Sequence, residues 1–393
     1  MDLDVPTPMN ETQKTRKMLD LGLAGETTAN ETTPHSPKYN HTQSLEPSIV
    51  DNCSMVHSQA SYLSHATTDE SQTPFKREPS INPSERLAEL GLLEYPVHRK
   101  AISLPTRMPE SLRLLTRTMR KIEKGEGIIP QDDKTDELRG WLADEEDEDD
   151  CNRVVSSNRA ECGSVPDLMF ALNMEATTME MIEGGCSDAD WNCSVHYPIL
   201  AEACERSVAS QHIRVRNITT ASIADAASNT TRQADFAITF DISDAAKAAL
   251  SKRGIESLSH SNFQPLCYSP PAVIIAARTD DTHGQEVDLQ LRTWAYAHVM
   301  NLRALLHKVG RPQTPIPGLP LLEVQGGRWH FSYLEIRFEM AVVWSQVAVG
   351  DVSTVRGVYQ ILTALQKLVE WITTTYEPWF LENIVKPLIH SPK

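Results

Sequence analysis

Residues 234–242 read Ala-Asp-Phe-Ala-Ile-Thr-Phe-Asp-Ile, and residues 272–277 read Ala-Val-Ile-Ile-Ala-Ala. The first stretch alternates large apolar residues with smaller or polar ones, which is the pattern of a half-buried strand. The second is a short continuous apolar run, which is typical of a strand buried on both faces. Residues 287–308 then carry apolar side chains at helical spacing and predict a helix lying on that sheet. The stretch therefore predicts an α/β domain.

The outer parts of the chain differ in composition. Residues 1–81 are rich in Thr, Ser, Asn and Pro and poor in apolar residues, which predicts a disordered tail. Residues 82–385 have the apolar content of a folded domain. Within it, the run of seven acidic residues from Asp144 to Asp150 predicts an exposed, mobile acidic loop over residues 141–164. Alternation over residues 329–349 predicts a pair of hairpin strands, and Ser353 is expected to cap a long final helix.

Charge and length limit the function. The chain has 393 residues and a net charge of −16, which argues against a generic polyanion-binding surface but leaves room for a local basic cleft. The acidic, proline-broken start does not resemble a signal peptide, and no apolar run approaches the ~20 residues that span a bilayer. The seven cysteines lack metal-finger spacing, which predicts reduced thiols. We expect a cytoplasmic or nuclear protein with no membrane partner.

One predicted helix, over residues 109–124, has two dissimilar faces. Its apolar residues recur at helical spacing, and its other face carries five basic residues, Arg113, Arg117, Arg120, Lys121 and Lys124. Such a face is either a phosphate-binding stripe or an ordinary solvated surface, and the second case is the more frequent one.

Several short segments occur in an order that matches a known family. They are Asn82-Pro-Ser-Glu-Arg-Leu, Trp191-Asn-Cys-Ser-Val-His, Ala234-Asp-Phe, Gln290-Leu-Arg-Thr-Trp, Leu319-Pro-Leu-Leu and Val347-Ala-Val-Gly-Asp-Val-Ser-Thr. In these segments the chain resembles the fungal PD-(D/E)XK nuclease-like proteins. The resemblance implies a restriction-endonuclease-like core of the α/β class, in which a small mixed β-sheet is flanked by helices.

The resemblance also implies a chemistry. In nucleases of this type, carboxylates hold a magnesium-type ion that activates water and stabilises charge on the phosphate. Asp235 matches the first metal-binding Asp, and Gln290 matches the glutamine of the following helix. The next strand should read acid, any residue, lysine, but the sequence there is Ala276-Ala277-Arg278. Alanine cannot bind a metal, and arginine stays charged, so it cannot act as a base, although it can contact phosphate.

The candidate site residues follow from this comparison. Asp235, Arg278 and Gln290 are the candidate catalytic residues. If a displaced carboxylate completes a metal site, the candidates are Asp235, Asp280 and Asp288, with Asp281 and Glu286 close by. Asp188 and Glu202 are the acids of the first core helix that could support a ligand. The expected cofactor is therefore none, or Mg²⁺ if the site is active.

Three functions remain open. The leading hypothesis is a pseudo-nuclease with a degraded catalytic motif that binds nucleic acid or a protein partner. The second is an active divalent-metal-dependent endonuclease that uses Asp235 and a displaced carboxylate. The third is an accessory protein of a fungal pathway, for example a secondary-metabolite pathway, in which the fold is repurposed. The sequence leaves the oligomeric state open.

Overall fold

The structure is a computed structural model. It describes residues 82–102, 109–132, 135–142, 148–209, 211–224, 234–279 and 284–390. The chain divides into two units, Met1–Phe75 and Lys76–Lys393, and every described residue belongs to the second. The expected disordered tail, residues 1–81, lies outside the described residues. In the described ranges, no helix is both long and apolar enough to cross a membrane.

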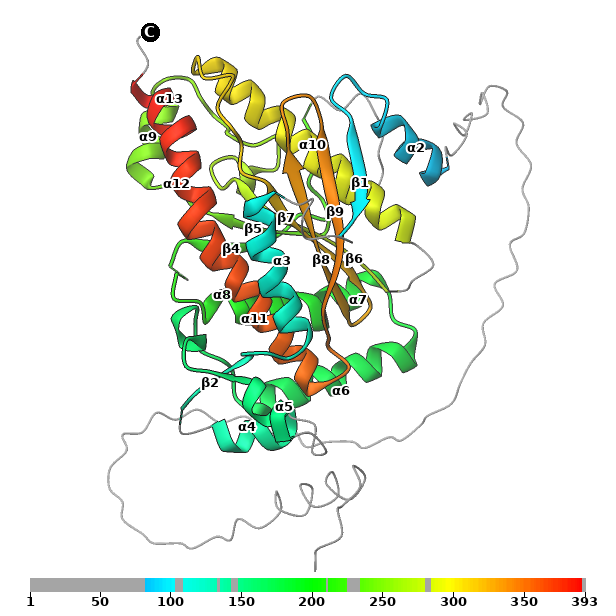
Figure 1. The fold of residues 1–393 in the computed structure, drawn as a ribbon. Helices are drawn as coiled ribbons and strands as arrows, with labels where there is room; N and C mark the ends of the chain where they lie inside the picture. Colours follow the sequence, from blue (N-terminus) through cyan, green and yellow to red (C-terminus); the bar gives the residue numbers. More distant parts are fainter. Residues whose placement is uncertain are drawn as a thin grey trace, which may run out of the picture. The chain divides into compact units, whose positions relative to one another are not determined.

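A mixed sheet forms the centre of this unit (Figure 1). In the described part it has seven strands in the order β1-β9-β8-β7-β6-β5-β4. The strands are β1 (Val97–Ala101), β4 (Ile213–Asn217), β5 (Phe236–Phe240), β6 (Pro271–Arg278), β7 (Leu319–Gln325), β8 (Arg328–Ile336) and β9 (Ala341–Asp351). The pairs β1–β9 and β6–β7 are parallel, and the other neighbours are antiparallel. The expected mixed sheet and the β8–β9 hairpin are confirmed, but β1 and β7 make the sheet larger than predicted.

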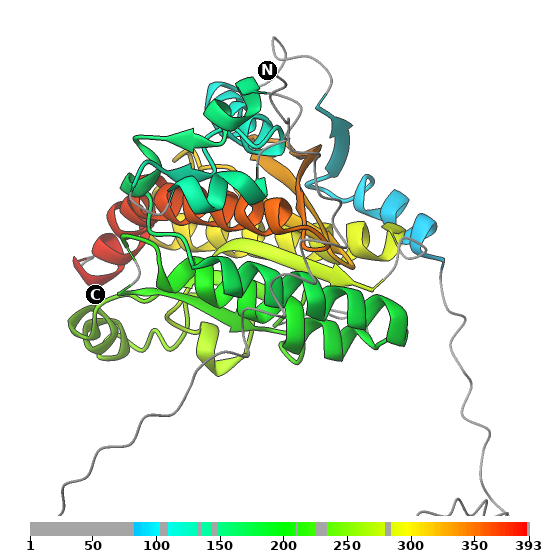
Figure 2. The same ribbon diagram turned by 90° about the horizontal axis from the view of Figure 1, so that it is seen from below.

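The remaining elements surround this sheet (Figure 2). The helices are α2 (Pro83–Leu90), α3 (Glu110–Glu123), α4 (Thr135–Leu142), α5 (Glu148–Arg153), α6 (Leu168–Gly184), α7 (Asp188–Trp191), α8 (Tyr197–Glu205), α9 (Asp244–Ser251), α10 (Gly284–Lys308), α11 (Val355–Trp371), α12 (Glu377–Phe380) and α13 (Lys386–His390). A second, two-stranded sheet pairs β2 (Ile129–Pro130) with β3 (Val155–Ser156). Helix α10 packs on β6 and β7, whereas α3 and α11 pack on β9 from the opposite side (Figure 1).

Strands β5 and β6 are both fully buried. All eight residues of β6 are buried, as expected for a strand covered on both faces. All five residues of β5 are buried as well, so the prediction that β5 is half-buried was wrong. The reason is that the C-terminal helices cover this strand, since the Phe240 ring packs against the rings of Tyr376 and Phe380.

In the part of the chain that the structure describes, three turns of π-helix interrupt the helices, and each has the same cause. They span Asn192–His196, Ile372–Tyr376 and Leu381–Val385. Each is followed, two residues after its end, by a proline: Pro198, Pro378 or Pro387. Proline has no N–H and clashes with the carbonyl four residues earlier, so the preceding turn widens. Helices α7 and α8 therefore form one continuous helix with a wide turn between them.

Two local expectations differ from the structure. Thr354, and not Ser353, caps α11, because the Thr354 hydroxyl accepts a hydrogen bond from Gly357 N–H at 3.0 Å. The Ser353 N–H is held by the Asp351 carboxylate at 2.9 Å instead. The segment 141–164 was expected to be one exposed loop, but its described part forms α5, β3 and a 3₁₀ turn. Arg356 orders this segment, since its guanidinium lies 2.5 Å from the buried Asp150 carboxylate. Residues 143–147 lie outside the described ranges.

Neutral histidines are part of the core. The rings of His260 and His298 are both buried, with centroids 5.2 Å apart, and His298 Nε2 lies 2.9 Å from the Tyr376 hydroxyl. Burial lowers the pKa of His298 to about 4 and that of His260 well below its ordinary value. Folding therefore keeps these imidazoles neutral at pH values where the unfolded chain binds protons.

This arrangement predicts acid sensitivity. Because the folded-state pKa values lie below the unfolded value of about 6.5, stability is lost as the pH falls from about 6.5 towards 4. Each histidine adds a slope of about 1.4 kcal/mol per pH unit in that window. In His298→Gln, the slope of the unfolding free energy against pH should be lower by about 1.4 kcal/mol per pH unit, because glutamine does not titrate. Urea unfolding from about pH 5 to 7 measures this, and an identical slope in the variant would contradict the assignment.

Candidate functional site

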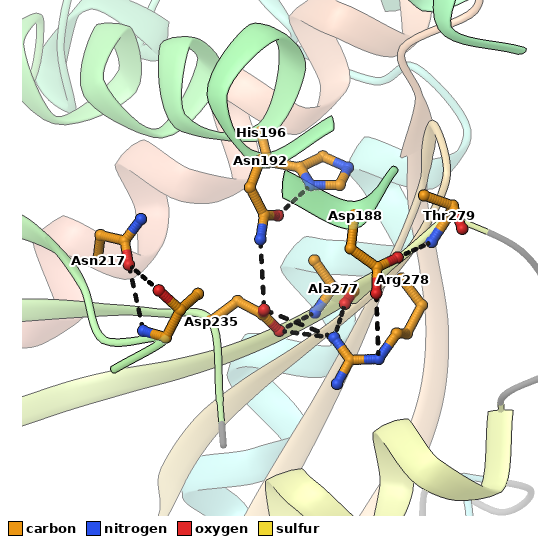
Figure 3. A network of polar contacts seen from close by, with 9 residues as sticks. Asp188, Asn192, His196, Asn217, Asp235, Ala277, Arg278 and Thr279 are labelled. Atoms are coloured by element: carbon orange, nitrogen blue, oxygen red, sulfur yellow. Dashed lines mark hydrogen bonds and ion pairs between the residues drawn. The ribbon is translucent and has the colours of Figure 1, made fainter. Parts of the chain in front are cut away.

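Asp235 lies just before β5, and its carboxylate is engaged by the protein (Figure 3). The residue is 5% exposed. One oxygen accepts a hydrogen bond from Ala277 N–H at 2.8 Å, and the other accepts from Asn192 Nδ2 at 3.3 Å. Asp235 therefore joins the start of β5 to the end of β6 and to the wide turn after α7.

Arg278, the last residue of β6, provides the counter-ion. Its Nη1 lies 3.2 Å from Asp235 Oδ2 and also donates to the Ala277 carbonyl. The arginine is 6% exposed, so the pair lies in a poorly hydrated environment where charge attraction is strong. Burial raises the pKa of Asp235, and the attraction of the Arg278 guanidinium opposes that rise.

Asp188, at the start of α7, contacts the same guanidinium from the other side (Figure 3). Asp188 Oδ2 lies 3.9 Å from Arg278 Nε, and Asp188 Oδ1 accepts a hydrogen bond from Thr279 N–H at 3.0 Å. Of the two acids expected from the first core helix, the structure brings Asp188 to the site. Glu202 instead forms an ion pair with Arg206 along α8.

His196 and Asn192 support Asp235 from the wide turn. His196 Nδ1 lies 2.9 Å from Asn192 Oδ1, and His196 Nε2 lies 2.9 Å from the Gly326 carbonyl. Burial lowers the pKa of His196 to about 4, and the hydrogen bond with the Gly326 carbonyl opposes that shift. His196 thus anchors the Asn192 amide that donates to Asp235.

Of the other predicted site residues, the described ones, Gln290 and Asp288, form no hydrogen bond or ion pair with this network. Gln290 is buried on α10, and neither atom of its amide has a hydrogen-bond partner among the described residues. Asp288 forms ion pairs with Arg99 at 2.8 Å and Arg292 at 3.0 Å. Asp280 lies in the segment 280–283, which is outside the described residues.

Glu323 is an acid that the sequence analysis did not single out. It lies on β7 directly beside Ala276 in the parallel register, and it is only 2% exposed. Its carboxylate accepts hydrogen bonds from Arg99, Ser332 and Gln346. In the sequence, the signal that could have identified Glu323 is that it is the single acid within the otherwise apolar run Leu-Pro-Leu-Leu-Glu-Val.

The described residues do not fit a divalent ion. Such an ion needs several free oxygen ligands around one point. Here Asp235 is held by three N–H donor groups, while Asp288 and Glu323 are neutralised by arginines. In the described ranges, no group of three or more His, Cys, Asp or Glu side chains is arranged to hold a metal. The guanidinium groups supply the positive charge next to these acids.

An αβββαβ order follows from these elements: the α7–α8 helix, then β4, β5 and β6, then α10 and β7. In the central sheet, the buried Asp235 lies just before β5, and the neighbouring strand β6 leads to the long helix α10. This arrangement is that of a nuclease-like α/β domain. A family model described as the PD-(D/E)XK nuclease superfamily matches residues 129–377, and the chain belongs to that superfamily. No curated protein and no solved structure matches the chain.

The buried pair makes a testable contribution to stability. Arg278→Met should destabilise the protein by about 3 kcal/mol, because it leaves the Asp235 carboxylate buried without its counter-ion. Adding Asp235→Asn should recover most of that loss, since a neutral pair has no charge to compensate. Urea unfolding of the two single variants and the double variant measures the coupling. Additive losses would show that the two side chains do not depend on each other.

Proposed function

We propose that this domain is a nuclease-like fold that binds nucleic acid and does not cleave it. The observation that carries the proposal is the Arg278 guanidinium, which lies beside Asp235 at 3.2 Å on the strand that should supply a second acid and a lysine. Nucleases of this superfamily usually use divalent metals. A metal ion approaching Asp235 would have to displace Arg278 against its charge, with no carboxylate at Ala276 to bind it.

Arg278 also lacks the acid–base role of a lysine. Its guanidinium stays protonated, so it cannot take a proton from water. What the site can do chemically is limited to charge and hydrogen bonding: the Asp188–Arg278–Asp235 arrangement fixes the ends of β5, β6 and α7 against one another. Such a site preserves the architecture of the fold, and binding becomes the function that this architecture supports best.

The alternative, an active endonuclease, requires a displaced carboxylate. By strand register Glu323 is the described acid closest to the place of Ala276, and its hydrogen bonds to Arg99, Ser332 and Gln346 occupy both of its oxygens. An assay for cleavage must therefore include variants of Glu323 as well as variants of Asp235.

We expect wild-type protein to leave plasmid DNA and RNA intact in the presence of Mg²⁺ or Mn²⁺. The double variant Ala276→Glu/Arg278→Lys restores the acid-any-lysine pattern and should bind Mn²⁺ at least tenfold more tightly than wild type, because it adds a carboxylate and removes the guanidinium. Calorimetric titration with MnCl₂ measures this. Arg278→Lys alone is the second variant, since it leaves Ala276 in the core unchanged.

The proposal is overturned if wild-type protein cleaves either substrate and Asp235→Asn or Glu323→Gln abolishes the cleavage. Glu202→Gln is the matched control, because this acid lies on α8, away from the site, in its own ion pair with Arg206.

A further inference from the structure

Helix α3 lies beside α11 on one side of the sheet (Figure 1), and it presents a basic face to solvent. Leu112, Leu115, Met119 and Ile122 are buried, and α3 packs on β9, whereas Leu114 is exposed. Arg113, Arg117 and Lys121 follow one another at four-residue steps and are all exposed, so they form one row along the helix. Lys124 is exposed as well, at the end of the same face.

These cations have few counter-ions. Within the described ranges, Arg113 pairs with Glu110 alone, at 4.0 Å, and that carboxylate is 94% exposed, so the pair contributes little. Arg120 donates to the Ile102 carbonyl at 3.1 Å. Among the described residues, Arg117, Lys121 and Lys124 form no ion pair with a carboxylate. In a chain of net charge −16, an uncompensated basic row of this kind stands apart from the rest of the composition.

The same face is hollowed by a cavity of about 360 Å³. It is lined by Arg113, Thr116, Arg117, Arg120, Lys121, Lys124 and Glu126. Thr116 is only 2% exposed, and its hydroxyl has no hydrogen-bond partner within the described ranges. A buried hydroxyl without a partner is costly, so it points to a ligand that can bond with it. The lining combines this hydroxyl with five guanidinium or ammonium groups and one carboxylate, that of Glu126, and this excess of positive charge suits a phosphate.

We propose that this face of α3 binds the phosphate backbone of nucleic acid, with one phosphate in the cavity at Thr116. The inference rests on the proposed function and names the surface that would carry it. From Arg113 to Lys124 the helix rises about 16 Å, the length over which one strand of a duplex carries about five phosphates. Backbone contacts of this kind carry no sequence preference. Helix α3 precedes the matched residues 129–377, so the surface is an addition to the nuclease-like region.

The test uses a fluorescein-labelled DNA duplex of about 20 base pairs and fluorescence anisotropy with the full chain, from about 50 to 200 mM salt. Arg113→Gln/Arg117→Gln/Lys121→Gln should weaken binding at least tenfold at the lowest salt. It should also reduce the slope of log Kd against log salt by about 2.7, because three phosphate contacts are lost. The matched control is Lys252→Gln/Arg253→Gln/Lys308→Gln, which removes the same charge elsewhere and should leave both quantities unchanged.

Thr116→Val tests the cavity separately. It removes only a hydroxyl that has no protein partner, so the fold should be retained, which a thermal melt checks. We expect binding about threefold weaker with an unchanged salt slope, because no charge is lost.

The outcomes separate the two proposals. If wild-type protein binds the duplex and the α3 triple variant binds as tightly as the control, the α3 surface is wrong and the proposed function stands. If wild-type protein binds neither the duplex nor a single strand at low salt, nucleic-acid binding is excluded and both fail. Tighter binding of a polyglutamate peptide at the same residues would assign the surface to an acidic protein and overturn the proposal.

Discussion

A buried ion pair between Asp235 and Arg278 is the constraint on which the site depends. It joins the residue that enters β5 to the last residue of β6, and the Ala277 N–H and the Asn192 amide complete the shell of the carboxylate. Removing either charge would leave the other uncompensated in a poorly hydrated place. The pair therefore fixes the strand ends and determines the chemistry still accessible at this edge of the sheet.

In a second cluster, buried acids are again neutralised by an arginine side chain. Arg99, on the edge strand β1, reaches both Asp288 on α10 and Glu323 on β7. It connects the first strand of the unit to elements about 200 residues later in the chain. The sheet is thus held, at these two clusters of buried acids, by arginine side chains from the sheet itself or from neighbouring elements. The buried charges of the site are used to stabilise the fold. Binding of nucleic acid by a separate, exposed basic surface such as that of α3 is compatible with that role.

Much of the fold could be predicted from the sequence, because the decisive signals are local. The apolar run at β6, the spacing along α10 and the Asp at the start of β5 identified the core. Strand β1 could not be found in the same way, because Val-His-Arg-Lys-Ala lacks alternation and pairs with β9 some 240 residues later. Strand β7 follows a proline-rich loop and pairs in parallel across the whole of α10, so its register with Ala276 is set by tertiary packing.

The sequence placed Asp235 and Arg278 correctly at neighbouring strand ends, but it could not show that they contact each other, since that depends on side-chain geometry. Their contact has a consequence for how the protein responds to its surroundings. A fold held together by a bound metal loses stability when chelators remove that metal. Here the counter-ion is covalently part of the chain, so the supply of divalent ions does not set the charge balance around Asp235.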